Sequence, residues 1–283
     1  MGALIHVTAW ERVSPWRRML CAFGRVAALL FLLTVLFNLL APPIGIFLMA
    51  RWEAKKIPLV KVTPQLLTDY SVSDAPGRTV SYLGYSFEVP WAASFKTKGS
   101  EKGSIKGGMM ELKFDSGQSL LLIAPSDQGG LLSQLAQDQS MHMENLRLIF
   151  GNLIYRSPYD QYSALLSTSP STIRAFGPRR EAIRGEILLS IKAIALPASL
   201  ESGVFAFQFP DKRGFQMGDP RKSRRIDLKI FDLSGHTLEI HCGTARDGEN
   251  LTQPELNRIL KTLHLVSSAS PAAHAVSAKA LRN

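Results

Sequence analysis

A run of 25 uncharged residues from Val26 to Ala50, bounded by Arg25 and Arg51, constrains this chain more than any other feature. As an α-helix, at about 1.5 Å per residue, the run would extend about 37 Å, more than the roughly 30 Å hydrocarbon core of a bilayer. A charge at the centre of such a span costs about 2.5–3.5 kcal/mol, and this run has none. We therefore expect residues 26–50 to form a transmembrane anchor after a basic cytoplasmic leader at residues 1–25.

Two other readings of the apolar run are less favoured. A cleaved signal peptide needs a short apolar core and a small-x-small site, but Ala41 has Leu39 two residues before it and Pro42 directly after it. A helix hairpin of a soluble protein needs a polar face, and residues 29–33 are apolar on all sides. The two prolines at 42–43 predict a kink in one span, or a break at Ala41 and a new helix.

The positive-inside rule does not decide the orientation of this anchor, because four basic residues lie near each end of the run. A short basic leader before a long C-terminal domain is the usual arrangement of a signal anchor. We therefore expect the N-terminus in the cytoplasm and the domain outside it, in the periplasm. The two cysteines give no further guide, since Cys21 lies in the leader and Cys242 is alone in the domain. The basic residues are Arg12, Arg17, Arg18 and Arg25 before the run, and Arg51, Lys55, Lys56 and Lys61 after it.

Composition divides the rest of the chain into three parts. Residues 51–78 contain several prolines and predict a juxtamembrane linker, in which 65–70 could hold a short helix. Residues 79–266 are long enough for one domain with its own core. Residues 267–283 are mostly small and predict a disordered tail.

Hydrophobic periodicity and capping signals predict the elements of the domain. Strands are expected at 85–89, 110–114, 120–123, 204–209, 226–230 and 238–242. Helices are expected at 127–150, after Ser157-Pro158, after Ser169-Pro170, over 183–194, and from the capping box at 252–255 to Leu263. This order predicts an α+β fold, an N-terminal transmembrane helix followed by an antiparallel sheet flanked by helices.

Two segments near the ends of the domain carry a resemblance to a known fold. They are Gly84-Tyr85-Ser86-Phe87-Glu88-Val89-Pro90-Trp91 and Arg258-Ile259-Leu260-Lys261-Thr262-Leu263. With the order of the elements, they make the stretch from Thr79 to Val266 similar to the PsbP-like/Mog-like fold of exported or membrane-anchored bacterial proteins. The resemblance implies a binding or scaffolding domain with no shared catalytic residues.

Metal and catalytic sites find little support in the sequence. On the expected strand Cys242 faces the core and His241 faces out, while His236 lies at the turn before it. These residues cannot meet at one ion without a bulge, and we expect neither a metal nor another cofactor. No nucleophile elbow is present, and the Gly-, Ser- and Lys-rich stretch 98–108 lacks the spacing of a phosphate-binding loop.

A basic cluster is the strongest functional signal. Six cations lie within fourteen residues, around the Gly-rich stretch 214–220, which we expect to be a turn-rich connection. Cations held at one edge of a sheet would attract an acidic protein or an anionic lipid surface. The alternative is a solvated loop that keeps an edge strand from pairing with other chains. The predicted binding residues are Lys212, Arg213, Arg221, Lys222, Arg224 and Arg225.

These patterns predict a single-span membrane protein that presents a binding or scaffolding domain and is not an enzyme. The alternatives are a cell-envelope hydrolase whose residues meet only in three dimensions, and a cytoplasm-facing domain that binds anionic lipid. The net charge of +10 does not indicate nucleic acid, because stacking aromatics and a recognisable module are both absent from the sequence. The sequence identifies neither the partner nor the oligomeric state.

Overall fold

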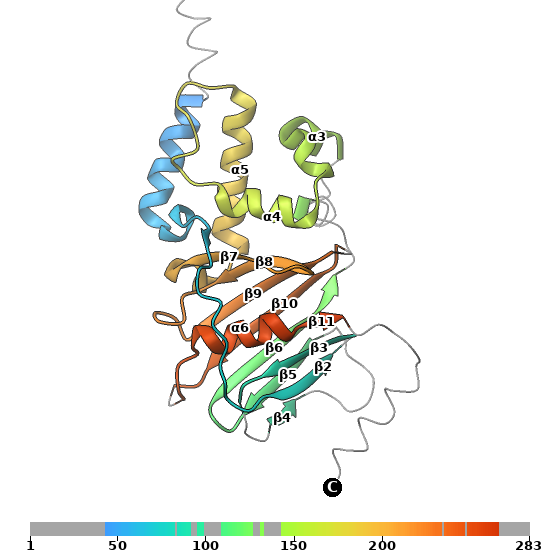
Figure 1. Ribbon diagram of the computed structural model, residues 1–283. Helices are drawn as coiled ribbons and strands as arrows, with labels where there is room; N and C mark the ends of the chain where they lie inside the picture. Colours follow the sequence, from blue (N-terminus) through green and yellow to red (C-terminus); the bar gives the residue numbers. More distant parts are fainter. Residues whose placement is uncertain are drawn as a thin grey trace, which may run out of the picture.

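The computed structural model describes residues 43–82, 84–91, 95–98, 109–126, 131–132, 143–233, 235–246 and 248–265. These residues form a mixed α+β structure in which helices flank a large sheet (Figure 1). One face of the sheet is covered by a helical layer, and the other by a C-terminal helix and a small second sheet. The predicted α+β arrangement of a sheet flanked by helices is confirmed.

The large sheet contains, within the described residues, the strands β1 (Gln65–Leu66), β4 (Phe95–Lys98), β5 (Met109–Phe114), β6 (Gln118–Ser126), β7 (Val204–Gln208), β8 (Lys212–Met217), β9 (Arg225–Asp232) and β10 (Thr237–Thr244). Their order is β1-β7-β8-β9-β10-β6-β5-β4. Neighbouring strands are antiparallel, except that β1 runs parallel to β7. The strands predicted at 110–114, 120–123, 204–209, 226–230 and 238–242 are confirmed.

The small sheet consists, in the described chain, of β11 (His264–Leu265), β3 (Tyr85–Val89) and β2 (Arg78–Tyr82), in that order. It lies beside α6 (Gln253–Thr262) over one face of the large sheet (Figure 1). The predicted capping box begins α6, since the Thr252 N–H donates to the Glu255 carboxylate at 2.7 Å. The two segments that carry the fold resemblance lie against each other, because Arg258 pairs with Glu88 at 2.9 Å.

The helical layer contains α3 (Met143–Phe150), α4 (Pro158–Ser167), α5 (Arg179–Ala195) and the short 3₁₀ turns η1 (Pro58–Lys61), η2 (Gly151–Tyr155) and η3 (Ala198–Ser202). The predicted cap of α4 is present, since Ser157 Oγ accepts the Asp160 N–H at 3.2 Å. Lys192 is fully buried in this layer and donates from Nζ to the carbonyls of Val62, Leu166 and Thr168. Burial lowers the pKa of Lys192 to about 8.

The predicted anchor lies mostly outside the described residues, as does the leader at 1–25. No helix of the described ranges is long and apolar enough to cross a membrane. Residues 43–56 are helical, and Ala50 and Ala54 pack into the core of the helical layer. The expected linker at 51–78 therefore includes the end of this packed helix, η1 and β1. The structure shows β1, and no helix, within residues 65–70, because the Leu67 N–H bonds to the Ala206 carbonyl across the sheet edge at 2.8 Å.

The expectation of a turn-rich connection at 214–220 is wrong for its first residues, because β8 runs to Met217 between β7 and β9. Gly214 serves close packing and not a turn. A Cβ there would lie 2.6 Å from the Phe207 ring and would also collide with the Lys229 carbonyl. The glycine therefore lets two neighbouring strands and an aromatic ring approach each other.

The helix predicted after Ser169-Pro170 is also absent from the structure. Thr172 donates to the Ser169 carbonyl to close a single turn, and the following residues form bends and turns. Pro178 disfavours helix at the residue before it, and buried Ile173 directs this turn inward. Of the helix predicted at 127–150, residues 131–132 and 143–150 are helical and the others lie outside the described residues. The loop at 99–108 and the tail at 267–283 also lie outside them.

Candidate functional site

The first two residues of the predicted basic cluster serve internal contacts at the start of β8. Lys212 is buried, and its Nζ donates to the Leu263 carbonyl at 2.5 Å and pairs with Asp211 at 3.0 Å. The hydrogen bond to the Leu263 carbonyl connects the end of α6 with the large sheet. The Arg213 guanidinium lies 3.9 Å from the centre of the Tyr159 ring, which is a cation–π contact with the helical layer.

Arg224 and Arg225, at the other end of the cluster, also bind within the chain. Arg224 Nη1 donates to the carbonyls of Ala245 and Arg246, across the turn that follows β10. Arg225 Nε donates to the buried carboxylate of Asp227 at 3.0 Å. These four cations are therefore engaged with groups of the same chain, which reduces their availability to a partner.

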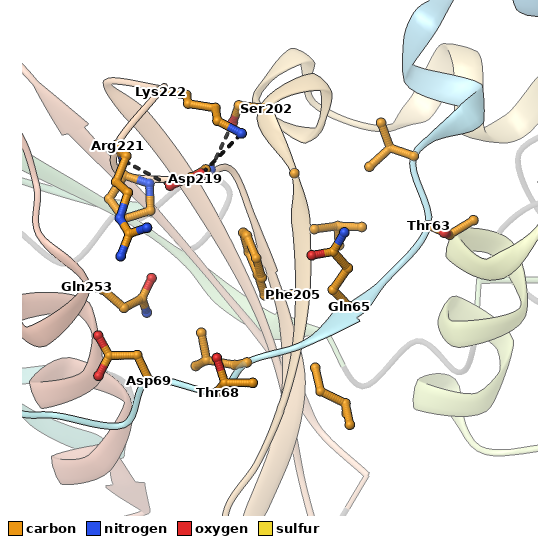
Figure 2. Close-up of a pocket in the computed structure, with 16 residues that line it drawn as sticks. Thr63, Gln65, Thr68, Asp69, Ser202, Phe205, Asp219, Arg221, Lys222 and Gln253 are labelled. Atoms are coloured by element: carbon orange, nitrogen blue, oxygen red, sulfur yellow. Dashed lines mark hydrogen bonds and ion pairs between the residues drawn. The ribbon is translucent and has the colours of Figure 1, made fainter.

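The remaining two cations, Arg221 and Lys222, line a hollow of about 390 Å³ at the edge of the large sheet. Figure 2 shows this edge hollow between β1, the start of β7, the loop after β8 and the start of α6. Lys222 Nζ lies 3.5 Å from Asp219 Oδ2. The Arg221 guanidinium makes no hydrogen bond or ion pair with any of the described residues.

The loop that presents these two cations is closely held. Gly218 has a φ of 115°, which favours glycine and turns the chain out of β8. The Asp219 side chain accepts the Arg221 N–H at 3.0 Å, and the Asp219 N–H donates to Ser202 Oγ at 2.9 Å (Figure 2). The backbone N–H of Lys222 bonds to the Asp219 carbonyl at 2.9 Å. Arg221 and Lys222 therefore project from a defined turn.

The opposite wall of the edge hollow is polar and negatively charged at one point. Hydrogen bonds from the Ser71 side chain and backbone lower the pKa of Asp69, and the charge of Arg221 adds to this effect. Gln253 exchanges two amide hydrogen bonds of 2.9 Å with buried Gln216. Asn257 continues this amide chain, since it accepts from Gln253 and donates to the carbonyls of Asp69 and Ser71.

The edge hollow thus combines an unpaired guanidinium, a lysine, two carboxylates and amide groups beside an edge strand. Such a wall can hydrogen-bond a polar main chain and pair with an acidic side chain. The structure provides no nucleophile next to a base among the residues that line it.

A second polar cluster, which sequence reasoning missed, lies between the sheet and the helical layer. Asp227 of β9 stands opposite His241 of β10, and Lys229 stands opposite Glu239. Asp227 accepts hydrogen bonds from Ser199 Oγ, Arg225 Nε and His241 Nδ1, and Lys229 pairs with Glu239. The strands predicted at 226–230 and 238–242 were the available signal, because antiparallel pairing between them brings these charges into cross-strand pairs.

Burial opposes ionisation of Asp227, but the hydrogen bonds from His241, Ser199 and Arg225 outweigh it and leave its pKa below the usual value. The carboxylate lies between the serine and the histidine. Because Ser199 donates to Asp227 and not to His241, these three residues do not form a nucleophile–base pair. His241 lines a hollow of about 400 Å³ next to them.

The residues weighed for a metal site lie as the strand periodicity predicted. Cys242 is buried in the core on the α6 side, where burial raises the pKa of its thiol, and His241 faces the opposite side of the sheet. That side is covered by the helical layer. His236 pairs with Asp232 at 3.1 Å. In the part of the chain that the structure describes, no group of three or more His, Cys, Asp or Glu side chains could hold a metal ion.

No model of a known protein family matches the chain, and no curated protein matches its sequence. A functional conclusion therefore has to come from the geometry of the chain itself.

Proposed function

We propose that this protein is a single-span, membrane-anchored binding protein whose domain holds an acidic, extended segment of a partner protein in the edge hollow. The observation that carries the proposal is Arg221, whose guanidinium lines the hollow without a partner among the described residues. Unpaired arginine favours an anionic ligand, and its planar fork suits a carboxylate.

The edge strand supports an extended partner. Gln65 and Leu66 of β1 pair with β7 on one side, and their other side forms the end of the sheet in the described chain. Leu66 is 79% exposed on this edge strand. A partner strand can add to such an edge through main-chain hydrogen bonds, while acidic side chains meet Arg221 and Lys222.

Membrane anchoring rests on the apolar run of residues 26–50. The helical residues 43–56 add some support, because Leu48, Met49 and Trp52 are exposed on them. Lys56 Nζ lies 3.6 Å from the centre of the Trp52 ring. Tryptophan and lysine side chains are common at membrane–water interfaces. The resemblance to the PsbP-like/Mog-like fold is a further reason to favour binding or scaffolding.

Crosslinking in intact cells, followed by purification of the full chain, tests the binding surface. The double variant Arg221→Gln/Lys222→Gln should lose the crosslinked neighbour of the wild-type protein. Arg156→Gln/Arg184→Gln is a matched control that removes two cations elsewhere, and it should retain that neighbour. An unchanged set of neighbours in the first variant would end the proposal that the edge hollow is the contact surface.

A reporter at the C-terminus tests the membrane topology separately. A reporter that is active only in the periplasm should give signal, and alkaline extraction should leave the chain in the membrane fraction. Signal from a cytoplasmic reporter would favour the alternative, in which the domain faces the cytoplasm and binds anionic lipid.

The hydrolase alternative has one specific observation in its favour, the pair of Asp227 and His241 beside the 400 Å³ hollow. With Nδ1 held by Asp227, His241 Nε2 makes no hydrogen bond with the described residues and could accept a proton from water. Any ester hydrolysis by the purified chain should then disappear in His241→Gln. Hydrolysis that persists in this variant would exclude His241 as the base.

A further inference from the structure

We propose that a second hollow, in the helical layer, binds the phosphate group of an anionic phospholipid. This arginine hollow has a volume of about 610 Å³ and lies between η2, α4 and the start of α5. Arg156, Arg180 and Arg184 line it, against the single carboxylate of Glu181. It lies outside the predicted basic cluster and shares no lining residue with the edge hollow.

The charges of the arginine hollow are not balanced within the described chain. The guanidinium groups of Arg156 and Arg184 make no hydrogen bond or ion pair with the described residues. By contrast, the charges beside His241 are paired, since Arg225 binds Asp227 and Lys229 binds Glu239. Three guanidinium groups around one hollow repel one another, and a bound phosphate would relieve that repulsion.

One of the arginines is held in place by the helical layer. Arg180 Nη2 donates to the Arg147 carbonyl in the last turn of α3 at 2.8 Å. Gly151 allows this position, because it has a φ of 57° and a Cβ on it would lie 3.0 Å from Arg180 Nη2. The Arg180 guanidinium is therefore positioned before any ligand binds, which lowers the entropy cost of binding.

The start of α5 makes the electrostatic potential in the arginine hollow more positive. Arg180 and Arg184 lie in the first two turns of this helix, where the helix dipole disfavours cations. No side chain caps the helix at Pro178. An anion in the arginine hollow would offset both the helix dipole and the arginine charges.

Apolar side chains in and around the arginine hollow favour a lipid as the ligand. Phe150, Leu153 and Leu188 line it beside the arginines. Leu148 and Tyr155, in the neighbouring α3 and η2, are 69% and 66% exposed. The helix at residues 43–56, which includes the end of the apolar run, begins at the same end of the helical layer as α5 (Figure 1). The choice of a lipid as the source of the phosphate rests on the proposed anchor, whereas the phosphate site itself does not.

Titration of the full chain in neutral detergent tests this site. The probes are dihexanoyl phosphatidylglycerol, dihexanoyl phosphatidylcholine and inorganic phosphate, with binding measured by calorimetry. We expect saturable binding of the phosphatidylglycerol and a loss of about tenfold or more in affinity in Arg156→Gln/Arg184→Gln, because this variant removes two of the guanidinium groups that would bind the phosphate. Lys113→Gln/Lys261→Gln is the matched control, because it removes two exposed cations that line neither hollow, and it should bind as the wild type does.

The remaining outcomes are equally decisive. Tight binding of inorganic phosphate, lost in the same double variant, would support the site and assign it to a soluble phosphate. Arg184→Lys should retain intermediate affinity, because it keeps the charge but loses the planar fork. If no probe binds, or if the double variant binds as tightly as the wild type, the proposal is overturned. Loss of this site with unchanged crosslinking at the edge hollow would leave the proposed function intact.

Discussion

The two faces of the large sheet are built from alternate residues of the same strands but differ in chemistry. On the α6 face, β9 and β10 present apolar side chains that are almost fully buried, among them Ile226, Leu228 and Ile240. On the helical face the intervening residues include Asp227 and Glu239, which bind partners across the strands. On β9 and β10 the α6 face is closed by apolar packing, whereas the helical face combines packing with paired charges.

This difference indicates that one face of the sheet serves stability, whereas the other face and the sheet edge contain the candidate binding sites. A continuous apolar face excludes water and specifies the register of the strands. Two hollows lie on the helical side of the sheet, one between the sheet and the helices beside His241 and one within the helical layer beside Arg184. The edge hollow lies where both faces end, at β1. Candidate binding sites therefore occur at the helical face and the sheet edge.

The largest effect is expected from a methyl group on the α6 face. Gly214→Ala should lower the free energy of unfolding by about 3 kcal/mol, since overpacking at a site without space is strongly destabilising. Urea unfolding of the full chain in neutral detergent measures it. Gly45→Ala is the control, because a Cβ there meets nothing within 4 Å and alanine favours the helix. Equal stability of the two variants would contradict the tight packing of β8.

A smaller effect is expected from the charges of the helical face. Asp227→Asn should cost about 2 kcal/mol at pH 7, because hydrogen bonds from Ser199, Arg225 and His241 to a carboxylate would be weakened. The pKa of Asp227 is lowered in the folded state, so its contribution is present above the unfolded pKa of about 3.9 and is lost as pH falls through the folded pKa.

Unfolding curves across pH check this sign. The difference between wild type and Asp227→Asn should narrow in acid, while exposed Asp74→Asn should stay close to the wild type throughout. A difference that remains constant from neutral to acidic pH would mean that the carboxylate charge is not what stabilises the cluster.

The smallest effect is expected within the helical layer, where Glu186 of α5 is poorly accommodated. Its two carboxylate oxygens are buried, and burial, followed by the charge of Glu53 and a side-chain hydrogen bond with Glu53, raises its pKa. A raised pKa in the folded state means a penalty that is absent below the unfolded pKa of about 4.3 and grows as pH rises through the folded pKa.

Glu186→Gln should therefore stabilise the protein at pH 7, by less than about 1 kcal/mol, and the gain should vanish in acid. Thermal unfolding at several pH values measures the gain. The control is Glu144→Gln in α3. Because Glu144 is exposed, this change should have little effect at any pH. A destabilised Glu186→Gln would show that the carboxylate has a partner that stabilises its charged form.

Much of the fold could be predicted because its signals are local. The alternation in β9 and β10, the proline after Ser157 and the capping box at Thr252 each act within a few residues. The prediction failed for β8, where Gly214 resembled a turn signal. Glycine is needed at 214 because Phe207 and the Lys229 backbone approach it from the neighbouring strands. No local sequence pattern contains that information.

The candidate sites were predictable only in part. The basic composition of residues 212–225 was visible, but its six cations separate in the structure. Lys212 lies in the core, Arg213 on an aromatic ring, Arg224 on two backbone carbonyls and Arg225 on Asp227, and the other two line the edge hollow. The arginine hollow could not be predicted, because Arg156 is far from Arg180 and Arg184 in the sequence. Their convergence depends on how η2 and α5 pack.

The amino-acid sequence by itself determined the apolar run, the period of most strands and helices, and the ends of α4 and α6, because these depend on residues close together in the chain. The tertiary structure alone decided which charges are paired and which face a hollow. Pairing depends on distance in space and on exclusion of water, and both arise only when distant segments pack together.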